Sequence, residues 1–291
     1  MTIDNHPRLQ SAHRDMEHGH WLPFTWGTST PGEQPRGELA LIRTGSSSGD
    51  HQAGLWRTGA GLVGCAADGS CRFAFAAPGG DETLFILEGK ATITVPATGR
   101  QQNLVPGSIV SQPKGVALDW AIEGPRFRAL WVHWNSPRIA TPGYAPVIAH
   151  VDDESPGWVP YEWIESENGL PYHCGEMLFF RTTGSTGTLK IGIWRASPDP
   201  GSDETAPIET CQCGRCAGHR IGSARGVGDE TMILLDGRSQ IVDEDTGAAY
   251  QFKAGDIIAV SEGLQGRWTS KARDMRKLFI VTNAKLPQAA E

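Results

Sequence analysis

The chain has 291 residues, of which 39% are hydrophobic and 20% charged, and such values are ordinary for a globular protein that buries a core without disulfides. The net charge is −7 and the basic residues are dispersed, which excludes the basic patch that a nucleic acid or an anionic membrane would need. No apolar run approaches the roughly 20 residues of a membrane span.

The N-terminal segment, residues 1–20, is polar and rich in histidine, with no apolar stretch of the kind found in secretory signals. We therefore predict a cytoplasmic protein. In that compartment the six cysteines are expected to be thiols or metal ligands rather than disulfides.

The two halves of the chain carry the same motifs in the same order. The early matches are offset by 137 or 138 residues, and every match from Gly80 onward is offset by 148. Chance similarity does not hold one register in this way, so the chain contains two copies of one unit, with an insertion in the second copy between Arg195 and Gly228. The matched segments are 21–26 with 158–163, 54–57 with 192–195, 80–83 with 228–231, 88–90 with 236–238, 106–109 with 254–257, and Trp120 with Trp268.

Each copy is predicted to consist of short strands. The apolar runs at 84–87 and 232–235 end at an acidic-Gly-basic triplet, and β-branched segments follow them at 91–95 and 239–242. No window shows a helical stripe longer than about two turns. Regularly spaced short strands with glycine turns predict a sandwich or a barrel. The domains are then 21–135 and 158–291, with a linker at 136–157 and a Cys-rich insertion at 196–227.

This ordered set of motifs resembles the cupin superfamily, in particular its ureidoglycine aminohydrolase-like and ethanolamine-utilisation-like branch. The resemblance covers residues 54–134 and 192–283, and the second copy is the closer match. It implies an all-β protein of two tandem cupin (jelly-roll) barrels, which we expect to pack against each other as a pseudo-dimer. The sequence leaves open whether two chains associate further as a homo-dimer.

The resemblance also implies a divalent metal inside each barrel, held by three histidines and a glutamate. Glu82 and Glu230 stand at the glutamate positions. All six histidine positions carry other residues, so the motifs predict no metal in either barrel, and this weighs against a ureidoglycine aminohydrolase, a dioxygenase or an oxalate decarboxylase. Those positions hold Ala76 and Pro78 (or Phe75 and Ala77) with Leu118, and Ala224 and Gly226 (or Ser223 and Arg225) with Gly266.

The insertion contains a dense group of soft metal ligands, Cys211, Cys213, Cys216 and His219. Three thiolates and an imidazole suit tetrahedral zinc, and four protein ligands would make the site structural rather than catalytic. A Cys-x-Cys pair chelates awkwardly, however, so a loop of reduced thiols stays an alternative.

Glu82 and Glu230 are the candidate acid–base residues. A carboxyl group in an apolar cavity has a raised pKa and can exchange protons near neutral pH. The alternative is an inherited turn residue in both copies.

The repeated arginines and tryptophans are candidate substrate-binding residues. Arg57 and Arg195 could hold a carboxylate through a bidentate fork, or serve as salt-bridge partners within the fold. Trp120 and Trp268 could line ligand pockets or simply belong to the core.

Together these features predict a bicupin that binds a small-molecule metabolite, as an isomerase-, lyase- or hydrolase-like catabolic enzyme without the usual histidine ligands. The alternative is a non-catalytic ligand-binding or regulatory bicupin, because such barrels host both kinds of function.

Overall fold

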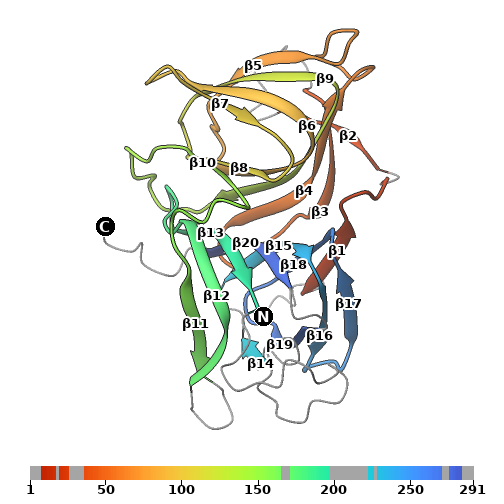
Figure 1. Cartoon of the computed structure of the whole chain (residues 1–291), viewed down its shortest axis with the longest axis vertical. Helices are drawn as coiled ribbons and strands as arrows, with labels where there is room; N and C mark the ends of the chain where they lie inside the picture. Colours follow the sequence, from red (N-terminus) through yellow and green to blue (C-terminus); the bar gives the residue numbers. More distant parts are fainter. Residues whose placement is uncertain are drawn as a thin grey trace. The chain divides into compact units, whose positions relative to one another are not determined.

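The computed structural model describes residues 8–17, 20–25, 36–164, 171–196, 222–225, 228–270 and 275–283 (Figure 1). Every regular element in these ranges is a β-strand, which confirms the predicted all-β class. The chain divides into two compact units. The first unit comprises Met16–Asp153 and Thr183–Thr188, and the second comprises residues 8–15, Glu154–Thr182 and Leu189–Asn283. The packing of the two units as a pseudo-dimer stays a prediction.

The first unit is built on two long strands, β6 and β9, which pair along most of their length. The main sheet has the order β10-β8-β6-β9-β4-β3-β2, with β5 on β9 and β7 on β6. Its strands are β2 (Leu22–Pro23), β3 (Glu38–Arg43), β4 (Asp50–Gly59), β5 (Cys71–Phe75), β6 (Asp81–Val95), β7 (Arg100–Leu104), β8 (Ser108–Gln112), β9 (Leu118–Asn135) and β10 (Val147–His150).

The second unit repeats this arrangement. Its sheets have the orders β1-β18-β15-β20-β13-β12-β11 and β14-β19-β16-β17, which match the first unit strand for strand if β6 and β9 are each divided in two. This match confirms the duplication. The strands are β1 (Leu9–His13), β11 (Val159–Ile164), β12 (Pro171–Arg181), β13 (Thr188–Arg195), β14 (Gly222–Arg225), β15 (Asp229–Asp236), β16 (Arg238–Asp243), β17 (Ala249–Lys253), β18 (Asp256–Val260), β19 (Gln265–Ser270) and β20 (Arg276–Asn283).

Each unit has one edge strand that the sequence analysis did not assign to a copy. The second unit takes β1, which precedes the first copy, and the first unit takes β10, which precedes the second copy. β1, within the predicted N-terminal segment, pairs with β18, and β10, within the predicted linker, pairs with β8. The registers are equivalent, since His13 lies opposite Asp256 and His150 opposite Ser108. Both strands are therefore part of the duplicated unit, and each covers a sheet edge that would otherwise expose unpaired backbone groups.

In the repeated Gly-Asp-Glu motif the aspartate has a structural role, and the glutamate is the candidate site residue. Asp81 is buried, and its carboxylate accepts hydrogen bonds from the backbone N–H groups of Lys114 and Ser185, both at 2.7 Å. Asp229 accepts one from the N–H of Glu262 at 3.1 Å. The aspartates thus fix neighbouring loops, and alternation along the strand turns the following glutamates toward the core.

Candidate functional site

Four polar side chains form a row across the core-facing side of the first unit's sheet. His133 on β9 lies directly opposite Gln52 on β4 and Glu82 on β6, and Glu82 lies opposite Gln112 on β8. Alternation gives these residues the same face as Trp131 and Leu84, which belong to the hydrophobic core. The row therefore sets polar groups against the apolar interior of the unit.

The imidazole of His133 lies between two carboxylates. Its Nδ1 is 3.0 Å from Oε1 of Glu82, and its Nε2 is 3.6 Å from Oδ2 of Asp50. The ring stacks on Trp131 at a centroid distance of 6.0 Å, and a Cβ on Gly80 would come within 2.7 Å of its Cε1. Glu82 is 4% exposed, whereas the side chain of Asp50 is 51% exposed, so the cluster runs from solvent into the core.

Burial and charge act on this cluster in opposite directions. Burial raises the pKa of Glu82 above its usual range, and the adjacent His133 offsets this only in part. Burial by itself lowers the pKa of His133, but its contacts with Asp50 and Glu82 outweigh burial and raise that pKa to about 9. The interaction with His133, 3.6 Å away, lowers the pKa of Asp50. At neutral pH the imidazole is therefore a cation held by two carboxyl groups.

Two buried acceptors in the row accept no hydrogen bond from the described residues, although the indole of Trp131 lies close enough to Glu82 to lower its pKa. They are Oε2 of Glu82 and Oε1 of Gln112, on neighbouring strands. The amide nitrogen of Gln112 is already engaged, because it donates to the carbonyl oxygens of Phe75 at 2.8 Å and Val116 at 2.6 Å. A buried acceptor without a donor costs about 1–3 kcal/mol, so a molecule that supplies donors at this point is stabilised there.

The comparisons with known proteins place this fold. A family model described as an EutQ-like cupin domain matches residues 183–279, and no curated protein matches the chain. Residues 183–279 thus match a cupin domain model, and the chain as a whole has a cupin-like fold. Its fold is similar to that of a DUF861 protein of unknown function from Pseudomonas syringae pv. tomato, with 17% identity, a TM-score of 0.63, and coverage of 95% of this chain and 100% of that one.

Two further solved structures share the cupin fold at low identity. The protein Ylba from E. coli is 13% identical with a TM-score of 0.57, over 96% of this chain and 92% of that one. A variant of oxalate decarboxylase from Bacillus subtilis is 13% identical with a TM-score of 0.51, over 94% of this chain and 77% of that one. At such identities the likeness shows the fold alone.

In the described residues no helix is long and apolar enough to cross a membrane.

The residues in the first cupin barrel do not fit the metal usual in the superfamily. Phe75 and Ala77 are buried in the core, and the ring nitrogens of His133 face carboxylates on two different sides. Across the described part of the chain, no three His, Cys, Asp or Glu side chains are grouped to hold a metal ion. These residues therefore do not supply the ligand set of that metal.

The second cupin barrel carries a different pair in the corresponding region. Val281 lies opposite Glu230, where the first barrel has His133 opposite Glu82, and Val260 stands in place of Gln112. Glu230 is instead paired with Lys277, whose Nζ lies 3.2 Å from its Oε1. The structure thus brings each predicted glutamate next to a basic residue, but not the same one.

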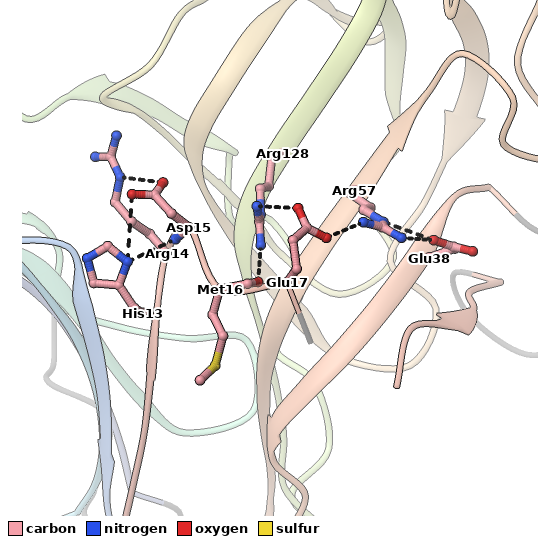
Figure 2. Close-up of polar contacts among 8 residues, drawn as sticks. All are labelled: His13, Arg14, Asp15, Met16, Glu17, Glu38, Arg57 and Arg128. Atoms are coloured by element: carbon pink, nitrogen blue, oxygen red, sulfur yellow. Dashed lines mark hydrogen bonds and ion pairs between the residues drawn. The ribbon is translucent and has the colours of Figure 1, made fainter. Parts of the chain in front are cut away.

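The predicted arginines lie in matching clusters on the other side of their strands. Trp56 faces the core, so the adjacent Arg57 faces away from it. Figure 2 shows the Arg57 guanidinium between Glu38, at 2.8 Å, and Glu17, at 2.9 Å. The guanidinium carbon, Cζ of Arg57, also lies 4.0 Å from the ring centroid of Trp21.

Arg195 repeats these contacts in the second unit. It lies 2.7 Å from Glu176, 3.6 Å from Glu154 and 3.9 Å from the ring centroid of Trp158. Both arginines are thus engaged by two glutamates and a tryptophan, and the structure does not bring either one into the polar row. Substrate binding by them stays a prediction.

The remaining predicted site residues are in three different situations. Trp120 is buried in the first core and stacks on Phe73 at 6.0 Å. Trp268 packs on the second core and lies 4.6 Å from Nζ of Lys277. The zinc ligands predicted in the insertion, Cys211, Cys213, Cys216 and His219, lie outside the described residues.

His133 and Lys277 are the functional candidates that the sequence analysis missed. Each is a polar residue on the core-facing side of a strand whose neighbouring core-facing residues are apolar. That pattern was visible in the sequence, because His133 keeps the alternation of Phe127, Ala129 and Trp131. The sequence did not show which glutamates they would contact, because these lie 51 and 47 positions away.

Proposed function

We propose that this bicupin binds a small polar metabolite in its first barrel and exchanges a proton with it through Glu82. The observation that carries the proposal is the buried Glu82–His133 pair, with Asp50 on the far side of the imidazole. A carboxyl group buried in an apolar core has the raised pKa that acid–base catalysis near neutral pH requires. An isomerase-, lyase- or hydrolase-like reaction uses such a step.

Glu82, His133 and Asp50 have different roles in the proposed proton exchange. Oε2 of Glu82 is the atom that takes or returns the proton, because Oε1 is occupied by His133. His133 is a positioning residue whose positive charge stabilises the carboxylate of Glu82 between the two transfers. Asp50 in turn orients the imidazole through its second nitrogen.

The orphaned acceptors indicate the ligand class. Oε2 of Glu82 and Oε1 of Gln112 both require a donor, so the metabolite should present hydroxyl or N–H groups rather than bare carboxylates. A carboxylate here would be repelled by Glu82 and Asp50. Small hydroxylated carbonyl compounds satisfy this requirement and also carry C–H groups acidic enough to exchange.

The test combines binding with proton exchange. Purified full-length protein is screened by thermal shift against glycolaldehyde, hydroxyacetone, dihydroxyacetone, lactamide and glycolate, and deuterium uptake at carbon from D2O is followed by proton NMR. We expect at least one hydroxylated carbonyl compound to stabilise the protein and to exchange. Glu82→Gln should slow that exchange by about 100-fold or more while retaining binding.

Glu88→Gln is the matched control, since Glu88 lies on the same strand but is exposed. It should leave both readouts unchanged. Binding that depends on Glu82 and His133 without any exchange would refute catalysis and assign a ligand-binding or regulatory role. Binding and exchange that survive Glu82→Gln would refute the site itself.

A further inference from the structure

The second barrel contains an ion pair that the proposed function does not use. Lys277 projects from β20 to the same side as the core residues Met275 and Phe279, and Glu230 projects from β15 to the same side as Met232. Nζ of Lys277 lies 3.2 Å from Oε1 of Glu230. The first copy has Ala129 in place of Lys277, so the pair belongs to the second copy alone.

Aromatic rings complete the surroundings of the ammonium group. Nζ lies 4.6 Å from the ring centroid of Trp268 and 6.0 Å from that of Trp194, and 3.6 Å from the thioether sulfur of Met232. The rings and the carboxylate hold the cation in a mostly apolar setting, where its electrostatic interactions are stronger than in water. The side chains are 14% and 20% exposed, so both charged groups remain open to a small molecule.

Each member of the pair keeps hydrogen-bonding capacity. An ammonium group has three donors, and Lys277 uses one on Glu230 and one weakly on sulfur within the described residues. Oε2 of Glu230 accepts no hydrogen bond there. One donor on a positive charge and one acceptor on a negative charge therefore lie side by side.

We propose that this pair is a binding site for a small zwitterion, an α-amino acid. The ligand carboxylate would accept from Lys277, and its ammonium group would donate to Oε2 of Glu230, giving two antiparallel charge pairs. The ammonium and carboxylate of an α-amino acid flank a single carbon, which matches the close spacing of Nζ and Oε1. A lone anion or a lone cation would satisfy one partner and be repelled by the other.

The experiment titrates full-length protein by calorimetry with the proteinogenic L-amino acids, and with the N-acetyl and amide derivatives of each one that binds. We expect binding of at least one amino acid, and losses of about tenfold or more for both derivatives, because each lacks one charge. Lys277→Met and Glu230→Gln should each cause a comparable loss. Lys253→Met, which changes an exposed lysine of the same unit, should cause none.

Three outcomes would overturn the proposal. They are no binding by any amino acid, an N-acetyl derivative that binds as well as its parent, and an amide that binds as well as its parent. Circular dichroism of each variant checks its fold, and the isosteric Glu230→Gln keeps the test decisive if Lys277→Met unfolds. Glu82→Gln should leave amino-acid binding unchanged, so failure here is distinguishable from failure of the site in the first barrel.

Discussion

Replacing Glu82 by glutamine should move the titration of His133. In the intact protein the His133 pKa is about 9, against a reference value of 6.5. At about 1.36 kcal/mol per pKa unit, the net difference favours the protonated ring by about 3 kcal/mol, because the carboxylate contacts outweigh the opposing effect of burial. Glu82 is the buried partner at 3.0 Å, whereas Asp50 is half exposed at 3.6 Å, so Glu82 should supply the larger share. We expect Glu82→Gln to lower the His133 pKa by roughly one to three units.

The sign of the stability effect follows from linkage. A histidine whose pKa is raised by folding stabilises the protein fully below pH 6.5, and this contribution is lost as the pH rises through about 9. The free energy of unfolding, from urea denaturation at intervals between pH 6 and pH 9.5, should therefore fall across that window. The fall should be much smaller in Glu82→Gln and absent in His133→Gln.

Heteronuclear NMR of the imidazole measures the same pKa directly. Asp50→Asn is the matched control and should lower the His133 pKa by less than Glu82→Gln, because its carboxylate is screened by solvent. A His133 that titrates near 6.5 in the intact protein would refute the reasoning. So would a pKa that Glu82→Gln leaves unchanged.

Three further expectations concern other parts of the chain. Asp81→Ala should lower the free energy of unfolding by about 3 kcal/mol or more, since it frees two backbone donors now bonded to a buried carboxylate; urea denaturation measures this, and Asp81→Asn should cost less. Glu17→Gln should cost less than about 1 kcal/mol in the same assay, because the glutamate is 67% exposed and such ion pairs contribute little. If purified protein carries a stoichiometric metal, elemental analysis should identify zinc, and Cys213→Ser combined with Cys216→Ser should remove it. Iron or manganese that survives this double change would contradict the predicted ligands.

The sequence by itself determined the architecture of each copy. The constant offset from Gly80 onward required two units with one strand order, and the sheets show that order twice. The motif spacing also singled out Glu82 and Glu230 as candidate acid–base residues. Both features are local or periodic, so they can be detected in a single amino-acid sequence.

The sequence patterns did not predict β1 and β10, the two edge strands that pair with β18 and β8. β1 and β10 are short, and their segments are polar enough to resemble a tail and a linker. What makes them strands is the exposed edge of β18 or β8, more than 30 residues distant in both cases. Propensity is a weak guide wherever pairing with a distant edge decides the conformation.

Only the tertiary structure showed which residues lie next to the two glutamates. Glu82 and Glu230 occupy equivalent positions in equivalent motifs, and the sequence treats them alike. Cross-strand pairing brings a histidine to the first and a lysine to the second, from strands about 50 residues further along. The ionisation of a buried carboxyl group depends on the charge and burial of whatever lies within a few ångströms. The pairing of distant strands brings equivalent positions to both glutamates, and the partners differ because the first copy has His133 where the second has Val281, and Ala129 where the second has Lys277.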